Sequence, residues 1–177
     1  MSKIRLVLLS CCAPCSAGAI VQLKEQDADF CVLFYNPNIF PESEYQKRLT
    51  EQVRLCEESG VKYAIGNWAH DEWLSCIRGL ENEPERGGRC AACFRHRFGF
   101  ARKFALENGY NSIASVFGVS RHKDRAQVDF AAAGTLSDVN YISIEWDEFL
   151  RQKIIKKAGF YRQNYCGCEF STKAEKQ

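Results

Sequence analysis

The stretch LLSCCAPCSAG, residues 8–18, joins a short apolar run to a predicted helix through three closely spaced cysteines. In many α/β proteins the loop after the first strand carries glycines that hold a phosphate, whereas this loop carries Cys11, Cys12 and Cys15. Pro14 restricts the backbone between them, and a helix N-terminus favours the thiolate form that binds metals. We therefore expect a thiol-bearing site in the crevice at the carboxyl ends of the strands, where open α/β sheets bind ligands.

Five β-rich runs recur along the chain, with helical patterns between most of them. The runs are 4–10, 30–36, 61–66, 111–118 and 139–145, and the helical patterns cover 42–59, 70–80, 89–109 and 147–158. Strands that alternate with helices predict a parallel sheet with helices on both faces. The expected fold class is therefore α/β, a Rossmann-like, doubly wound and mainly parallel sheet.

The composition is that of a globular protein, since 46% of the 177 residues are hydrophobic and 26% are charged. No Pro/Gly/Ser-rich linker interrupts the chain, so we expect one domain, 1–177, with an irregular C-terminal segment at about 159–171. With a net charge of +2, nucleic-acid binding would depend on local clusters of Lys and Arg. The apolar run near the N-terminus is too short to span a bilayer and lacks a signal-peptide cleavage pattern. These features predict a cytoplasmic protein without a membrane partner.

The chain has ten cysteines, and because the cytoplasm keeps thiols reduced, they indicate metal binding or redox chemistry. Cys90 and Cys93 form a C-x-x-C at a helix start, which places both on one face, as two ligands of one metal centre require. Cys166 and Cys168 form a C-x-C whose glycine permits a tight turn, and a strained disulfide there would suit a redox-active pair. Apolar surroundings predict core positions for the isolated Cys31, Cys56 and Cys76.

Three other kinds of protein fit parts of this pattern. A structural-zinc nucleic-acid-binding domain would use a C-x-x-C, but the clustered cysteines outnumber the four ligands that one zinc ion needs. A thioredoxin-like thiol/disulfide oxidoreductase would use the CAPC sequence after a strand and leave the other pairs without a role. A nucleotide-activating enzyme would suit the fold, but the loop lacks a glycine-rich phosphate cradle. The surplus of cysteines favours an iron–sulfur cluster with additional thiol chemistry.

Four motifs, CCAPCS, FYNPNIFPESEYQKR, RCAACFRHR and GFYRQNYCGCEFS, resemble those of the epoxyqueuosine reductases of the QueH type, in the same order and over nearly the whole chain. The resemblance implies a metal-dependent enzyme of the HUP-like α/β class. Such an enzyme removes the epoxide oxygen of epoxyqueuosine in the anticodon loop of tRNA and gives queuosine, in the last step of that pathway. An electron donor, not identified by the sequence, would supply the reduction.

The resemblance also implies roles for individual residues. Carried over by position, Cys11, Cys12, Cys90 and Cys93 would hold a [4Fe–4S] cluster. Cys166 and Cys168 would form the redox-active thiol/disulfide pair. One additional metal ion, iron or zinc, would lie next to the cluster, with ligands that the sequence does not assign. The role of Cys15 also stays open.

Proton donors and substrate contacts are proposed from position along the chain. Asp124, His122 and Tyr165 follow strands or flank the cysteines and are the candidate donors. Phe40 stands where many members of the family are expected to have His or Tyr, a departure that removes the basis for assigning a proton-delivery role to that position. Substrate contacts are expected from stretches that mix Arg, Lys and aromatic residues, which suit stacked bases and neutralised phosphates. These stretches are NPNIFPESEYQKR, RHRFGFARK, SRHKDR and FYRQNY.

Overall fold

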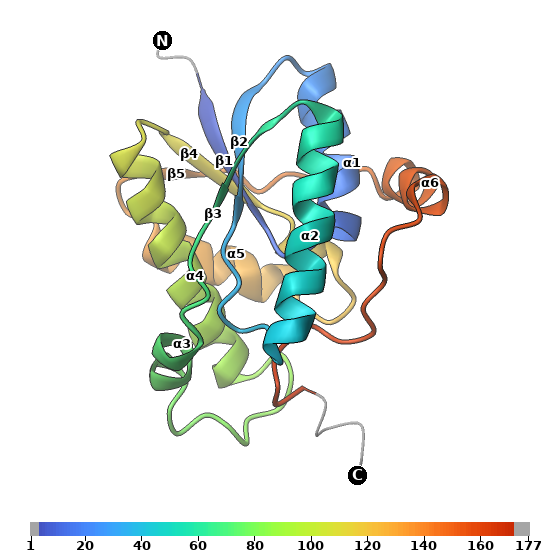
Figure 1. Cartoon of the computed structure of the whole chain (residues 1–177). Coiled ribbons are helices and arrows are strands. Elements are labelled where there is room, and N and C mark those ends of the chain that lie inside the picture. The colour runs from blue at the N-terminus through green and yellow to red at the C-terminus, as the bar shows by residue number, and fades with distance from the viewer. Residues whose placement is uncertain (1–3, 172–177) are drawn as a thin grey trace.

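The structure is a computed structural model that describes residues 4–171 (Figure 1). Its sheet has strands β1 Arg5–Ser10, β2 Asp29–Phe34, β3 Lys62–Ile65, β4 Ser112–Ser115 and β5 Asn140–Tyr141. The strand order is β3-β2-β1-β4-β5, and every neighbouring pair is parallel. This order confirms the predicted Rossmann-like doubly wound sheet.

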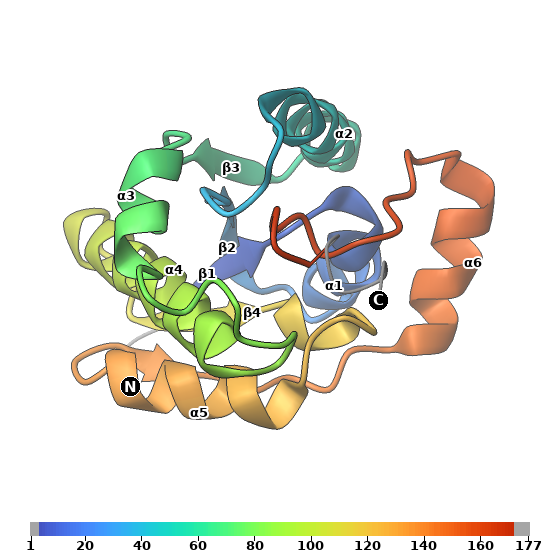
Figure 2. The same cartoon turned by 90° about the horizontal axis from the view of Figure 1, so that it is seen from below.

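Helices cover both faces of the sheet, as predicted. They are α1 Ala13–Glu25, α2 Glu42–Ser59, α3 His70–Cys76, α4 Gly88–Glu107, α5 Arg125–Thr135 and α6 Glu148–Ala158, with a short 3₁₀ turn η1 Phe117–Val119. Figure 2 shows α1, α2 and α6 on one face, while α4 and α5 cover the other beside α3. Because both faces are covered, the central strand β1 buries a continuous apolar run, Leu6, Val7, Leu8 and Leu9.

The predicted helix over 42–59 has the observed bounds, and Gly60 ends it in the left-handed conformation at φ +65°. Other predictions were too long. The helix expected over 70–80 ends at Cys76, and the edge strand expected over 139–145 pairs with β4 only at Asn140–Tyr141. Cys31 and Cys56 are buried as predicted, but the core position predicted for Cys76 is wrong, since the last residue of α3 is exposed.

The C-terminal segment, here residues 159–171, leaves α6 and returns across the carboxyl edge of the sheet (Figures 1 and 2). Cys168 forms an antiparallel bridge with Ile39, and the Phe40 N–H donates to the Gly167 carbonyl at 2.9 Å. The end of the described chain is thereby attached to the loop that follows β2. The single domain predicted over 1–177 extends beyond residues 4–171 at both ends and stays a prediction. Within the described range, no helix has both the length and the hydrophobicity needed to cross a bilayer.

Candidate active site

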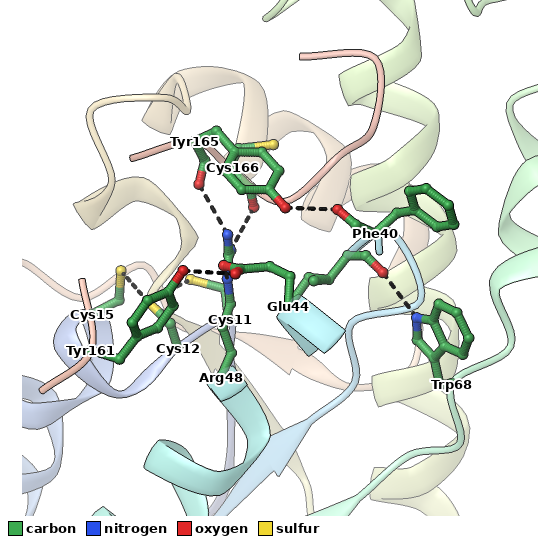
Figure 3. A network of polar contacts seen from close by, with 11 residues as sticks. Cys11, Cys12, Cys15, Phe40, Glu44, Arg48, Trp68, Tyr161, Tyr165 and Cys166 are labelled. Carbon is green, nitrogen blue, oxygen red and sulfur yellow. Dashed lines mark hydrogen bonds and ion pairs between the residues drawn. The ribbon is translucent and has the colours of Figure 1, made fainter. Parts of the chain in front are cut away.

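Three thiols lie together where β1 ends and α1 begins. Cys11, Cys12 and Cys15 are buried, and their sulfur atoms all lie within 4.8 Å of one another. The Cys12 and Cys15 sulfurs are 2.9 Å apart, and those of Cys11 and Cys12 are 3.9 Å apart (Figure 3). Such a group can hold a metal ion, and it includes Cys15, whose role the sequence left open.

Buried polar side chains fix the backbone of this thiol turn. The Ser16 hydroxyl donates to the Cys12 carbonyl at 2.9 Å, and the Ser10 hydroxyl donates to the Gln52 side-chain oxygen at 2.6 Å. From the end of β2, the Asn36 amide donates to the Ser10 carbonyl at 3.0 Å. Since each partner is buried, breaking one of these bonds would leave a polar group unsatisfied. The thiol turn is therefore held rigidly.

The second pair of thiols opens α4, as predicted. Cys93 is buried against Trp73 and Cys168, while Cys90 is half-buried and its sulfur accepts from the Arg86 N–H at 3.3 Å. A small cavity at this point is lined by both α4 cysteines and by both cysteines of the C-terminal segment. The C-x-x-C and the C-x-C, more than seventy positions apart in the sequence, therefore share one wall.

A second and larger cavity, of about 680 Å³, lies beside the thiol turn. Cys11 and Cys15 line it from one side, and the C-terminal segment lines it from the other. Cys166, His122 and Lys123 line both cavities. The three cysteine groups thus surround one continuous region at the carboxyl edge of the sheet, where the sequence predicted a site.

The thiols of the turn differ in acidity. Hydrogen bonds from Cys12 and Cys15 hold the pKa of Cys11 well below its usual range. Burial raises the pKa of Cys12 to about 12, and the hydrogen bonds with Cys11 and Cys12 raise that of Cys15. Burial also raises the pKa of Cys90 to about 11 and that of Cys168 to about 12. One thiolate, Cys11, is therefore stabilised by two S–H donors, and the other thiols would release protons on binding a metal.

Cationic groups lie against these thiols. Burial by itself would lower the pKa of Lys123, but the neighbouring negative charges of Cys11 and Cys166 raise it. Arg97 is 1% exposed and donates to the Tyr35 carbonyl and the Asn36 side chain. Among residues 4–171, no carboxylate lies within ion-pair distance of Arg97. A buried cation without a carboxylate requires negative charge from another source, which thiolates can supply.

The donor set fits a thiolate-bound metal cluster. Trp73 and Arg89 line the small cavity; the Trp73 indole N–H faces the Cys93 thiol, and the Arg89 Nε–H has no acceptor among the described residues. Sulfur atoms of a cluster would accept such hydrogen bonds. A thiolate-bound cluster would also supply the negative counter-charge for the Arg97 guanidinium, which has no carboxylate partner. The residues around the small cavity therefore suit a thiolate-bound metal group. Of the four predicted ligands, Cys90 and Cys93 line this cavity, whereas Cys11 lines the larger one and Cys12 lies in the thiol turn beside it.

The remaining predicted residues lie in different places. His122 lines both cavities and Tyr165 lines the larger one, so both can reach the site. The exposed Asp124 lines neither; its carboxylate caps α5 by accepting from the Ala126 N–H at 3.0 Å. Its proposed proton-donor role stays a prediction, and the position instead follows the N-cap preference for Asp. Phe40 stacks its ring against His70, at 5.1 Å between ring centres.

Four site residues were not singled out from the sequence: Glu44, Arg48, Arg97 and Lys123. All four fall inside stretches expected to contact substrate: Glu44 and Arg48 in NPNIFPESEYQKR, Arg97 in RHRFGFARK, and Lys123 in SRHKDR. Glu44 and Arg48 have i, i+4 spacing, which is typical of exposed helix pairs, but here both are buried. Nothing in the local pattern signals that burial, because it depends on the C-terminal segment.

Comparison with known proteins assigns the family. Residues 6–174 match the family model described as "Epoxyqueuosine reductase QueH". The chain is 37% identical to the Epoxyqueuosine reductase QueH of Acinetobacter baylyi, over 94% of this chain and 80% of the relative. The chain belongs to the QueH family. The QueH protein of Histophilus somni is 38% identical, over 94% of this chain and 72% of the relative. Membership of this family makes the protein an oxidoreductase.

Two solved structures share the fold of this QueH family member. One is described as the U34-tRNA thiolase NcsA from Methanococcus maripaludis with its [4Fe-4S] cluster. It has a TM-score of 0.59 at 14% identity, over 98% of this chain and 63% of that one, which is less than two thirds of NcsA. The other is a predicted subunit of a tRNA methyltransferase from Methanocaldococcus jannaschii, with a TM-score of 0.56 at 12% identity, over 88% and 75% of the two chains. These likenesses confirm the HUP-like, Rossmann-like fold class.

Proposed function

We propose that this protein removes the epoxide oxygen of epoxyqueuosine in tRNA by a two-electron reduction that gives queuosine. The family assignment supports the reaction. The position of Cys166 is the observation that supports placing the reaction at this site. Cys166 lines both the larger, substrate-sized cavity and the small cavity that the other thiols line. A dithiol at that junction can serve both a bound nucleoside and a metal centre.

We propose a [4Fe–4S] cluster as the resident cofactor, with Cys11, Cys12, Cys90 and Cys93 as its ligands. When bound, the cluster would supply single electrons. Three groups support an anionic sulfur-rich group at this point: the Trp73 indole N–H beside Cys93, the Arg89 Nε–H without a described acceptor, and the buried Arg97 without a carboxylate partner. Because the Cys15 sulfur lies 2.9 Å from that of Cys12, Cys15 is an alternative ligand or a ligand of the additional iron or zinc ion.

The reaction must balance in electrons and protons. Conversion of an epoxide to an alkene consumes two electrons and two protons and releases one water. Oxidation of Cys166 and Cys168 from two thiols to one disulfide supplies two electrons and two protons, so one turnover of the pair matches one epoxide. An external electron donor must then reduce the disulfide again. His122 and Tyr165 are the proposed groups that hold a proton near the departing oxygen.

The larger cavity is the proposed nucleoside site. Its volume of about 680 Å³ lies within the range of small-molecule sites. Its lining includes the exposed Arg86, Arg121 and Arg162, together with the ring of Tyr165. Cations neutralise phosphates and aromatic rings stack on unpaired bases, so the rim suits a single-stranded loop of RNA. Of the four stretches expected to contact substrate, SRHKDR provides Arg121, and FYRQNY provides Arg162 and Tyr165. The stretch NPNIFPESEYQKR contributes Arg48 to the lining, while Arg86 lies outside all four.

The test is a direct assay of the nucleoside. Reduced protein that was purified and loaded anaerobically is incubated with tRNA carrying epoxyqueuosine, and the digested nucleosides are analysed by mass. We expect the loss of one oxygen, and no loss with Cys90→Ser. An unchanged nucleoside, together with efficient reduction of a protein disulfide, would instead support a thiol/disulfide oxidoreductase. A colourless anaerobic preparation with stoichiometric zinc alone would restore the structural zinc site.

A further inference from the structure

The guanidinium of Arg48 is buried against the backbone of the C-terminal segment. Arg48 lies on α2 and is 2% exposed. Its guanidinium donates to the Cys166 carbonyl at 3.0 Å and to the Tyr165 carbonyl at 3.2 Å (Figure 3). The guanidinium carbon, Cζ, lies 5.2 Å from the centre of the Tyr165 ring. One side chain therefore contacts the main chain on both sides of the Tyr165–Cys166 peptide bond.

Glu44, one turn earlier on α2, holds this guanidinium in place. Its carboxylate accepts from Arg48 Nε at 2.7 Å and, through its other oxygen, from the Tyr161 hydroxyl at 2.7 Å. Glu44 is 6% exposed, so the ion pair is buried. Burying two charges is costly unless every donor and acceptor is satisfied, and here the C-terminal segment supplies the remaining partners. The pair is thus built to bind this segment.

The sequence of the segment is adapted to the same contact. Gly167 has φ +111°, a conformation that L side chains rarely adopt. A Cβ there would lie 2.8 Å from Ile39 Cγ1 and 3.0 Å from Arg48 Nη1. Glycine between the two cysteines therefore lets the backbone approach α2 closely enough for Arg48 to reach the Cys166 carbonyl.

The contacts leave the sulfur of Cys166 free while fixing its backbone. Arg48 binds the carbonyl, Phe40 binds Gly167, and Ile39 forms the bridge with Cys168. Each of these contacts is made by the main chain of the cysteine pair. The thiol itself is left to line the two cavities.

We propose that Arg48, held by Glu44, is a positioning residue that orients the Cys166–Cys168 dithiol at the junction of the two cavities. This inference rests on the proposed function for its effect on turnover, but not for its effect on the thiols. Loss of the guanidinium frees the backbone of Cys166, so that its sulfur leaves the junction more often. Arg48 also belongs to the wall of the larger cavity, so the reactivity of the Cys166 thiol, measured without substrate, is the readout that reports positioning.

Thiol alkylation tests the proposal without cofactor or substrate. Apo-protein is treated with iodoacetamide under native conditions, and alkylation of each cysteine is followed by peptide mass spectrometry. The exposed Cys76 serves as an internal reference for reagent activity, and the core residue Cys56 reports loss of fold. Variants are Arg48→Gln, Arg48→Lys and Glu44→Gln. Arg102→Gln is the matched control, because Arg102 forms an exposed ion pair with Asp138 at 2.5 Å away from the site.

We expect Arg48→Gln to raise the alkylation rate of Cys166 relative to Cys76 about tenfold, since a charged hydrogen bond is lost. Glu44→Gln should give a smaller increase, Arg48→Lys a partial rescue, and Arg102→Gln no change. In the loaded enzyme, Arg48→Gln should lower kcat and retain the iron content. An unchanged Cys166 rate in folded Arg48→Gln would overturn the proposal.

Loss of the fold and failure of the proposed function can each be told apart from failure of the positioning role. If Arg48→Gln exposes Cys56 as well, the protein has lost its fold, and the milder Tyr161→Phe, which removes only the outer bond to Glu44, decides by the same relative rate. An increase in Tyr161→Phe upholds the proposal, and no increase overturns it. If alkylation responds as expected but wild-type enzyme leaves epoxyqueuosine unchanged, the positioning role stands and the proposed function fails.

Discussion

The thiol turn at Cys11–Cys15 and the C-terminal segment 159–171 present cysteines to the same region by different means. The turn is continuous with β1 and α1, and it is fixed by hydrogen bonds of the buried Ser10 and Ser16 hydroxyls and the Gln52 amide. The C-terminal segment has no helix or strand of its own after α6, and side chains and loops from the first half of the chain hold it. A rigid junction suits ligands of a metal centre, whereas an attached segment suits a pair that changes its covalent state.

The largest predicted effect separates the two regions by iron content. Cys11→Ser or Cys93→Ser should lose most of the bound iron and all turnover, because each removes a proposed cluster ligand. The double variant Cys166→Ser and Cys168→Ser should also lose turnover but keep its iron. Iron and acid-labile sulfide are measured after anaerobic purification, beside the nucleoside assay. If the double variant loses iron too, the C-terminal cysteines are ligands and the division of roles is wrong.

The sequence predicted the first region better than the second. A run such as Leu6 to Leu9 followed by CCAPC contains both its strand and its turn, so periodicity and capping rules place the thiols at the sheet edge. The helix with Cys90 and Cys93 was found for the same reason. Arg48 was expected only as part of a substrate-contact stretch, and its burial was missed because it depends on residues 117 and 118 positions away. Similarly, Cys76 is exposed because α3 ends there. The spacing of apolar residues over 70–80 does not predict this early helix end.

A second prediction compares two glycines that both have positive φ. Gly60 ends α2 at φ +65°, and an added Cβ there would meet no described side chain within 4 Å, so Gly60→Ala should cost about 1 kcal/mol of stability and leave turnover intact. Gly167→Ala meets Ile39 and Arg48 as well as the backbone strain, so it should displace the segment and reduce turnover at least about tenfold. Thermal unfolding and the nucleoside assay measure both. Equal losses of turnover would show that close packing at Gly167 is unimportant.

A third prediction asks whether the C-terminal segment also binds RNA. Arg162 belongs to the segment and Arg121 to the loop after η1, and both are exposed at the rim of the larger cavity. If each neutralises one phosphate of a single-stranded loop, replacing either by Gln should reduce the slope of log affinity against log salt by roughly 0.7. Filter binding of tRNA at several salt concentrations measures the slope, with Lys103→Gln on the exposed face of α4 as control. An unchanged slope for Arg162→Gln would show that Arg162 contacts no phosphate, and the segment would then keep only its proposed role in thiol chemistry.

The smallest effect concerns the start of the segment, where Glu51 of α2 accepts from the Tyr161 N–H at 3.1 Å. The hydrogen bond from Arg54, at 2.9 Å, is the main cause that lowers the pKa of Glu51. A carboxyl whose folded pKa is depressed stabilises the fold above its unfolded value, about 4.3, and this contribution is lost as the pH falls through the folded pKa. Between pH 7 and pH 3 the apo-protein should therefore lose about 0.5 kcal/mol more stability than Glu51→Gln, a small amount because the pair is partly exposed.

Thermal unfolding at both pH values measures the difference. Glu58→Gln, which removes the other partner of Arg54 without touching the segment, should behave like wild type. Parallel pH profiles for wild type and Glu51→Gln would show that Glu51 does not fasten the segment, and that its other contacts, among them those of Arg48 and the loop after β2, hold it.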